Sequence, residues 1–399
     1  MTKGTIRLKR KTIRVICIST YIPQKCGIAT FTKDVTTAIN LLNPYALVEI
    51  MPIIKDGENP QFPWEVKYKI LQSDLNSYLQ AATYINHSSC DLVLIEHEFG
   101  IFGGECGKYL IPLLKAIQKP KVMTCHTLID DPQNKWGQVF QKLSENVDGL
   151  MVMAQDSAQK LINLYGVKKD IIAVIPHGTP DLTYNATEIH KKKKNLSGKL
   201  VLGNINLLSE NKGIDYALEA VAQIVKKYPQ ILYLVIGQTH PNILAAEGEK
   251  YRNSLKLKIK NLGIQKNVRF INRYLTLEEL IKWLKVIDIY ITPYLDPQQS
   301  SSGALAYAVG AGKSCISTQY LYAQEILANG RGILVPFRDS TAIAKAIISL
   351  CENHTQKKQI EKKAYKYGRF MTWSSVALQH LDFFAQIIKK HESKRPKTS

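Results

Sequence analysis

Long apolar runs, paired cysteines and acidic residues are all scarce in this sequence of 399 residues. The longest apolar runs have the length of a strand, well short of the ~20 residues that span a bilayer. The N-terminal segment is basic and its apolar stretch is interrupted by Arg14, so we expect an arm that leads into a strand and not a signal peptide. The seven cysteines include no C-x-x-C pair, which argues against zinc or a disulfide framework and favours reduced thiols in a cytoplasm.

Two familiar nucleotide-binding motifs are also missing. No G-x-G-x-x-G follows the first predicted strand, so a site of the NAD type is not favoured. The segment Gly312-Lys313-Ser314 resembles the end of a phosphate-binding P-loop, but the position of the first glycine of that motif is occupied by Tyr307.

The deficit of acidic residues produces a large positive charge. There are 53 Lys and Arg against 33 Asp and Glu, a formal net charge of +20, which suggests an anionic partner. The whole excess lies in four segments, with +6 in residues 1–14, +5 in 191–199, +5 in 357–369 and +4 in 389–399. Because no nucleic-acid-binding module is present, we expect no nucleic acid partner. Basic appendages that contact an anionic membrane surface are one interpretation, and solubilising tails are the other.

Short apolar runs alternate with amphipathic segments in the first half of the chain. The expected strands are 13–18, 46–53, 92–96, 121–125, 149–153 and 172–175. The expected helices include 28–42, 74–86, 104–117 and 155–165. These strands are apolar throughout, which is typical of parallel strands covered on both faces. The order therefore predicts a doubly wound α/β sheet.

The pattern stops in a polar stretch and then starts again. Strands are expected at 200–203, 231–236, 268–271, 287–292 and 314–318, and helices at 214–227, 242–262, 277–286, 301–309, 340–352, 357–369 and 374–390. We therefore predict two Rossmann-like domains, residues 1–182 and 199–373, joined by a linker at 183–198 and followed by a C-terminal helix and basic tail at 374–399.

Polar residues follow the predicted strands of the first half, at the edge where open α/β sheets bind ligands. Gly27 lies between the first strand and a helix, where a backbone amide can approach a phosphate; a simple turn glycine is the alternative. His97, Glu98 and Glu105 surround the end of another strand. Because such groups are costly to bury unpaired, a polar cleft is favoured over solvated charges.

Two histidines follow later strands in the same way. His126 comes directly after the strand 121–125, where it can donate to a sugar hydroxyl or polarise a reacting group; a core histidine is the alternative. His177 lies in Ile175-Pro176-His177-Gly178, and its position before the linker predicts a wall of an interdomain cleft.

The second half contains two candidate anion sites at the starts of helices. Lys212 lies just beyond a strand at the mouth of a helix, where it can act as a point charge for a diphosphate; a surface lysine is the alternative. Ser301, Ser302 and Gly303 open another helix and offer hydroxyl and amide donors; ordinary N-capping by one serine is the alternative.

Taken together, these motifs resemble the family 4 glycosyltransferases, a large group of retaining enzymes with the GT-B fold that use nucleotide sugars. The resemblance covers roughly residues 14–384. Its pieces occur in the family's order: the Cys26-Gly27 loop, His126, Ile175-Pro176-His177-Gly178, Lys212-Gly213 and the helix of Ser301-Ser302-Gly303. The segment 96–105 looks like a subgroup of bacterial enzymes that make exopolysaccharides or lipid-linked glycans.

The resemblance implies two facing Rossmann-like domains with parallel sheets and an active site in the interdomain cleft. The first domain would hold the acceptor and the second the nucleotide sugar, and the last helix would cross back onto the first domain. The implied catalytic residues are His126 and Lys212; the donor-binding residues are Gly27, Lys212, Ser301, Ser302, Gly303, Tyr307 and Glu325; the acceptor or cleft residues are His97, Glu98, Glu105 and His177. No metal and no other cofactor is implied, because the substrate is itself a GDP- or UDP-linked sugar.

The sequence departs from the family pattern at three positions. The family usually has Arg five residues before the lysine of the Lys-Gly pair, and here the residue is Leu207. The family also usually has two glutamates before and within the helix predicted here at 301–309. In this sequence the two positions are occupied by Gln299 and Tyr307. Arg273 could replace the missing cation, and Glu325 could supply a carboxylate to the nucleotide.

The sequence thus predicts a cytoplasmic hexosyltransferase that acts on a glycan or lipid-linked acceptor, with peripheral contact at the inner face of the cell membrane. Retention of configuration is implied by the resemblance alone. Two alternatives stay open: a glycoside phosphorylase on the same fold, and a non-catalytic GT-B partner in a polysaccharide assembly complex.

Overall fold

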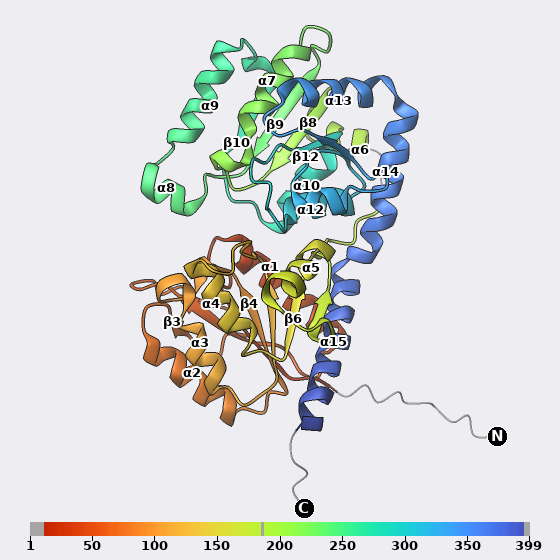
Figure 1. The fold of residues 1–399 in the computed structure, drawn as a ribbon. Coiled ribbons are helices and arrows are strands. Elements are labelled where there is room, and N and C mark those ends of the chain that lie inside the picture. Colours follow the sequence, from red (N-terminus) through yellow and green to blue (C-terminus); the bar gives the residue numbers. More distant parts are fainter. Residues whose placement is uncertain (1–11, 185–186, 395–399) are drawn as a thin grey trace, which may run out of the picture. The chain divides into compact units, whose positions relative to one another are not determined.

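The computed structural model describes residues 12–184 and 187–394, and the chain divides into two compact units (Figure 1). The first unit extends to Val152 and includes Ala158–Ile175 and the segment from Ala377 onwards. The second comprises Met153–Ser157 and Pro176–Val376. Most of the predicted N-terminal arm and the end of the basic tail lie outside the described residues. In the part of the chain that the structure covers, no helix is both long enough and apolar enough to cross a membrane.

The first unit is built on a seven-stranded sheet in the order β3-β2-β1-β4-β5-β6-β7. All its strand pairs are parallel. The strands are β1 Val15–Ser19, β2 Glu49–Ile54, β3 Ile70–Leu71, β4 Leu92–His97, β5 Lys121–Cys125, β6 Gly149–Val152 and β7 Ile172–Val174. The helices of this part are α1 Gly27–Leu42, α2 Leu75–His87, α3 Leu110–Ala116, α4 Lys135–Ser144 and α5 Gln155–Tyr165, with short 3₁₀ turns η1 Phe99–Ile101, η2 Glu105–Gly107 and η3 Lys169–Ile171.

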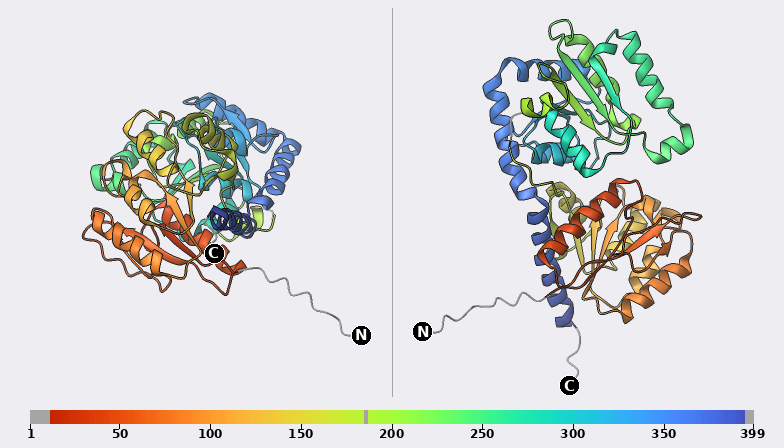
Figure 2. Two further views of the ribbon diagram at one scale, coloured as in Figure 1. Left: turned by 60° about the horizontal axis from the view of Figure 1, so that its bottom comes forward. Right: turned by 180° about the vertical axis from the view of Figure 1, so that it is seen from behind.

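Helices cover both faces of this sheet, because side chains of a strand alternate between its two faces. Alternate strand residues such as Ile16, Ile18 and Ile95 pack in one core with α2, α3, α4 and α5. The intervening residues point to the other face, where α1 lies, and Figure 2 shows this helix in red from behind. The strands are therefore apolar throughout because helices cover both faces of the sheet, as the sequence predicted.

The second unit is built on a six-stranded sheet in the order β10-β9-β8-β11-β12-β13, again with parallel pairs. The strands are β8 Leu200–Ile205, β9 Ile231–Ile236, β10 Val268–Ile271, β11 Ile289–Thr292, β12 Ser314–Thr318 and β13 Ile333–Val335. The helices are α6 Thr187–Lys192, α7 Ile214–Ile224, α8 Pro241–Glu247, α9 Lys250–Asn261, α10 Leu277–Val286, α11 Gly303–Gly310, α12 Leu321–Ile326, α13 Ser340–Glu352 and α14 His354–Gly368, with η4 Glu210–Lys212, η5 Gln265–Asn267 and η6 Arg369–Met371. The prediction of two parallel-sheet, Rossmann-like units is confirmed.

Two predicted helices are interrupted by residues with left-handed backbone conformations. The helix expected at 104–117 begins as the turn η2, because Gly104, Cys106 and Gly107 have φ of 76°, 56° and 80°. The helix expected at 242–262 is divided into α8 and α9 at Gly248, where φ is 62°. A regular right-handed helix cannot contain such residues.

The predicted linker at 183–198 contains the short helix α6. Its Lys191 is buried, and its ammonium lies 2.6 Å from the Asp288 carboxylate in the second unit. The long C-terminal helix α15, Trp373–Lys394, begins in the second unit and continues from Ala377 in the first.

Candidate functional site

In each unit, the carboxyl ends of the parallel strands carry most of the predicted site residues. In the first sheet, the chain adds β2 and β3 on one side of β1 and then adds β4 to β7 on the other side. The point where the strand order reverses, the switch point, therefore lies between β1 and β4. Open α/β sheets bind ligands at such switch points. Gly27 follows β1, Glu98 follows β4 and His126 follows β5, so the fold brings these three residues to the same edge.

Gly27 is the first residue of α1 and is exposed. No atom lies within 4 Å of the position that a Cβ would take on it. The preceding Cys26 caps the helix through its Sγ, which accepts a hydrogen bond of 3.3 Å from the Ala29 amide. The start of a 16-residue helix is thus open to an approaching group, and its first amides favour an anion.

His126 is held by a buried carboxylate that the sequence analysis did not assign to the site. Its Nε2 lies 2.8 Å from Oε2 of Glu96, with side-chain exposures of 6% for His126 and 0% for Glu96. The Phe31 ring of α1 meets the imidazole edge to face at a centroid distance of 4.9 Å. The alternation of side chains along β4 was the signal that could have found Glu96, because it places that residue on the face of α1.

The same alternation sends His97 to the opposite face. Its ring is fully buried beside Phe99, Phe102 and Phe140, at centroid distances of 4.7, 5.8 and 5.9 Å. Neither ring nitrogen has a hydrogen-bond partner among the described residues. Burial, with a smaller contribution from His126, lowers the pKa of His97 to about 3, so the ring is neutral at physiological pH. In this structure His97 therefore lies in an aromatic core and lines no open surface.

Glu98 and Glu105 have different surroundings. Glu98 is half-buried, and its Oε2 accepts a hydrogen bond of 2.6 Å from the Thr127 hydroxyl. Glu105 is exposed and lies 2.7 Å from the Lys135 ammonium, which lowers the pKa of the Glu105 carboxyl. Of the two, Glu98 belongs to the cluster around His126, because its partner Thr127 is the next residue in the chain.

Lys212 occupies the corresponding edge of the second sheet, whose switch point lies between β8 and β11. Its ammonium is half-buried, 4.1 Å from the centroid of the Tyr294 ring. Within the residues that the structure describes, no carboxylate lies within 4.0 Å of this ammonium. Burial lowers the pKa of Lys212 to about 8, and the charge of Asp296 partly opposes this. This edge of the sheet thus holds the poorly solvated ammonium of Lys212, with which an anionic ligand could form an ion pair.

Gly213 directly follows Lys212 and lies close to the loop after β11. Its φ is 61°, and a Cβ placed on it would lie 1.9 Å from the Pro293 carbonyl oxygen. The Leu295 amide donates to the Asn211 carbonyl at 2.9 Å, which ties the same two loops together. Only glycine allows this close approach between the loops after β8 and β11.

A buried group of polar side chains lies beside Lys212. The Tyr294 hydroxyl donates to Oδ1 of Asn206 at 2.5 Å, and Nδ2 of Asn206 is buried without a partner among the described residues. Burial raises the pKa of Tyr294 to about 12, so it stays protonated. Ser302 caps α11 by accepting a hydrogen bond of 3.3 Å from the Leu305 amide. Tyr294 and Asn206 were not among the predicted site residues.

His177, Gly303 and Tyr307 lie together at the start of α11. A Cβ on Gly303 would lie 2.7 Å from Nε2 of His177, so a larger residue there would require the His177 ring to shift. Tyr307 meets the same imidazole edge to face at 5.9 Å. The carbonyl of Ser301 accepts a hydrogen bond of 2.9 Å from the Gln299 side chain.

Two proposed replacements for missing family residues already have partners. Oε2 of Glu325 accepts a hydrogen bond of 2.8 Å from the Gln155 amide. Arg273 forms an ion pair of 2.5 Å with Glu279 at the start of α10. Either side chain would have to exchange these partners before it bound a nucleotide.

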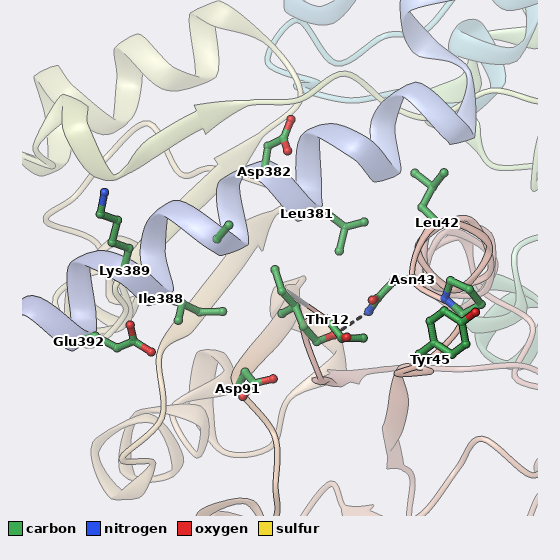
Figure 3. A pocket seen from close by; sticks show the side chains of 13 residues that line it. Thr12, Leu42, Asn43, Tyr45, Asp91, Leu381, Asp382, Ile388, Lys389 and Glu392 are labelled. Carbon is green, nitrogen blue, oxygen red and sulfur yellow. Dashed lines mark hydrogen bonds between the residues drawn. The ribbon is translucent and has the colours of Figure 1, made fainter. Parts of the chain in front are cut away.

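A pocket of about 490 Å³ lies at the other edge of the first sheet (Figure 3). Thr12 and Asp91, which precede β1 and β4, line it together with Leu42, Tyr45 and residues of α15. It is therefore found at the amino ends of the strands and is separate from the edge that carries Gly27 and His126.

Three comparisons relate the chain to known proteins. Residues 185–367 match the family model described as glycosyl transferases group 1. A D-inositol 3-phosphate glycosyltransferase of Corynebacterium efficiens is 25% identical over 286 residues, which are 67% of this chain and 66% of that protein. The enzyme of the same name from Corynebacterium kroppenstedtii is 24% identical over 396 residues, which are 91% of this chain and 83% of that protein.

Solved structures share the fold at low sequence identity. Anabaena HepE in complex with UDP has a TM-score of 0.74 at 13% identity and covers 94% of this chain and 100% of its own. Sucrose-phosphate synthase from Thermosynechococcus elongatus has a TM-score of 0.76 at 17% identity, with the same two coverages.

Proposed function

We propose, from the match of residues 185–367 to the family model described as glycosyl transferases group 1, that the protein is an enzyme that transfers a hexose from a nucleotide-diphosphate sugar to a glycan or lipid-linked acceptor. The structural neighbours support a uridine nucleotide, since HepE was solved with UDP and with UDP-glucose. GDP remains the alternative donor nucleotide of the proposal.

The environment of Lys212 is the observation that carries this proposal. A half-buried ammonium with no carboxylate partner in the described chain favours a ligand of negative charge. It lies at a switch point and packs on Tyr294, whose hydroxyl is hydrogen-bonded to Ser302 at the start of α11. A nucleoside diphosphate supplies the anion that such a site favours, and charge-assisted hydrogen bonds would stabilise the leaving diphosphate without a metal.

The proposal also gives roles to two residues of the first unit, His126 and Gly27. His126 would contact the transferred sugar, and the open start of α1 at Gly27 would approach the donor phosphates. The proposal includes retention of configuration, with the leaving phosphate assisting deprotonation of the acceptor hydroxyl. The basic termini would contact an anionic membrane surface that carries a lipid-linked acceptor.

Nucleotide-dependent stabilisation tests the proposal. A ligand that binds only the folded state raises the melting temperature, so UDP or GDP at about 100 Kd should stabilise the protein by about 2.7 kcal/mol. Lys212→Ala should reduce the shift strongly and abolish nucleotide-dependent turnover while leaving the fold intact. A shift with inorganic phosphate alone would favour a glycoside phosphorylase, and no shift with any of these ligands would favour a non-catalytic protein.

Turnover of His126→Ala tests the role at the reacting sugar. This variant should lose more in kcat than in nucleotide affinity, because the side chain would act on the sugar and not on the diphosphate. Release of nucleotide from a panel of UDP- and GDP-sugars gives the donor and the rate in the same assay. Equal losses in turnover and nucleotide binding would contradict the assignment.

A further inference from the structure

We infer that Tyr294 is the positioning residue of Lys212: the face of its ring holds the ammonium at the edge of the second sheet, where the diphosphate would bind. The inference rests on the proposed function of Lys212. Its basis is the distance of 4.1 Å between the Lys212 ammonium and the centroid of the Tyr294 ring. A cation at this distance is attracted by the negative face of an aromatic ring.

The register between two loops places the lysine opposite the tyrosine. On one side of the pair, the Leu295 amide donates to the Asn211 carbonyl at 2.9 Å. On the other side, the glycine after Lys212 comes so close to the proline before Tyr294 that a Cβ on it would lie 1.9 Å from the proline carbonyl oxygen. Lys212 and Tyr294 are the middle residues of these two segments, so the backbone itself sets one side chain opposite the other.

The Tyr294 ring is itself held in place. The residue is 1% exposed, and its hydroxyl donates to Oδ1 of Asn206 at 2.5 Å. The Tyr320 ring stacks on it at a centroid distance of 5.1 Å and an interplanar angle of 15°. The Thr318 hydroxyl donates to the Tyr294 carbonyl at 2.6 Å. Partners at the ends of β8 and β12 therefore fix the ring before a ligand binds.

The ammonium of Lys212 depends on this ring for its place. Within the described ranges, no hydrogen bond and no carboxylate within 4.0 Å holds the ammonium. Asp296, on the loop after β11, is the charged group that faces it, and Oδ1 of Asp296 accepts a hydrogen bond of 2.9 Å from the Gln298 amide. The ring restricts the long side chain in advance, so less conformational freedom is lost when a diphosphate binds. The attraction to the ring also favours the charged form, against the effect of burial.

Nuclear magnetic resonance of labelled lysine tests this directly. With ¹³C at Cε, the Lys212 signal is assigned by its loss in Lys212→Met, and its protons should be displaced upfield by the aromatic ring. The displacement should persist in Tyr294→Phe, which keeps the ring, and vanish in Tyr294→Leu. The pKa of Lys212, read from the titration of this signal, should fall by about one pH unit in Tyr294→Leu, because the ring no longer favours the charged form. No upfield displacement in the wild type, or an unchanged pKa in Tyr294→Leu, would overturn the inference.

Affinity for UDP extends the test to function. Tyr294→Leu should bind UDP about 2- to 12-fold more weakly at pH 7.5, the effect of ordering one long side chain on binding, and Tyr294→Phe should stay within about twofold of the wild type. Pentafluorophenylalanine at position 294 keeps the shape of the ring and reverses the charge of its face, so it should weaken binding as Tyr294→Leu does, without a packing defect. Wild-type affinity with this residue, or equal losses in Tyr294→Phe and Tyr294→Leu, would overturn the inference.

A matched control separates positioning from general damage to the unit. Tyr233 on β9 is another fully buried tyrosine of the second unit, in the core with residues of α7. Tyr233→Leu should lower stability and leave the Lys212 signal and the affinity for UDP unchanged. Wild-type affinity for UDP in Lys212→Met would refute the proposed role of the lysine and with it the positioning role. Wild-type affinity and an unchanged Lys212 pKa in Tyr294→Leu, with weak binding by Lys212→Met, would refute the inference alone.

Discussion

Replacing Lys212 by methionine should make the free protein more stable and weaken its binding of a nucleotide. Methionine keeps the length and apolar stem of lysine and removes the charge. The lowering of the Lys212 pKa from 10.5 to about 8 means that burial disfavours the charged form by roughly 3 kcal/mol. Methionine also loses the attraction between the ammonium and the Tyr294 ring, which is worth about 0.5–2 kcal/mol. The expected net gain in the free energy of unfolding is about 1–2.5 kcal/mol at pH 7.

The pH dependence of this gain has a definite sign. Because the pKa of Lys212 is lower in the folded than in the unfolded state, the unfolded chain binds more protons between pH 8 and pH 10.5. The destabilisation by the charged lysine is therefore fully present below pH 8 and disappears as the pH rises to 10.5. The gain of Lys212→Met should be largest at pH 7 and should shrink above pH 8.

Urea unfolding at pH 7 and pH 9.5, with and without UDP, measures these quantities. Wild-type affinity for UDP should fall about tenfold per pH unit above pH 8, as the ammonium loses its proton. Lys212→Met should lose about 10- to 100-fold in affinity at pH 7, equivalent to a charged hydrogen bond of about 1.5–3 kcal/mol. A variant that is less stable than the wild type at pH 7, or that binds UDP as well, would refute the reasoning.

Two structural variants test the framework of the second unit. Gly213→Ala should lower the free energy of unfolding by at least about 2 kcal/mol, because its Cβ would lie 1.9 Å from the Pro293 carbonyl oxygen at a φ of 61°. The control Gly57→Ala has a similar φ of 77° in open space and should lose only about 1 kcal/mol; equal losses would contradict the close-approach argument. Asp288→Asn should lower the free energy of unfolding by about 1–3 kcal/mol in urea, because it removes the carboxylate at 2.6 Å from the buried ammonium of Lys191 and leaves only the more exposed Glu188 at 3.4 Å. A loss below about 1 kcal/mol would show that this ion pair contributes little.

Much of the fold follows from local patterns. Apolar runs of strand length, separated by helical spacing, predict parallel strands covered on both faces, and both sheets have this form. The interrupted helices could not be predicted, because glycines such as Gly248 take a left-handed or a right-handed conformation according to their surroundings. The short strands β3 and β13 were missed since two or three residues carry no periodic signal.

The candidate site was predictable in position more than in detail. Gly27, His126 and Lys212 each follow a strand in the sequence, and within each sheet the parallel strands carry their carboxyl ends to one edge. The consecutive residues Glu96 and His97 nevertheless have different surroundings. Glu96 lies beside His126, and His97 lies in an aromatic core. A strand turns successive side chains to opposite faces, and which face is the polar one depends on the helices packed there.

The sequence by itself indicated most of the strands and helices, the α/β order that predicts two parallel sheets, and the polar residues at the strand ends, because these are read from local patterns of apolar and polar residues. The tertiary structure alone decided the partners of those residues. The pairing of Glu96 with His126 joins residues 30 apart, and the packing of Lys212 on Tyr294 joins two strand ends of one sheet. Such partners, and the burial that lowers the pKa of Lys212, arise only when distant segments exclude water from the same place.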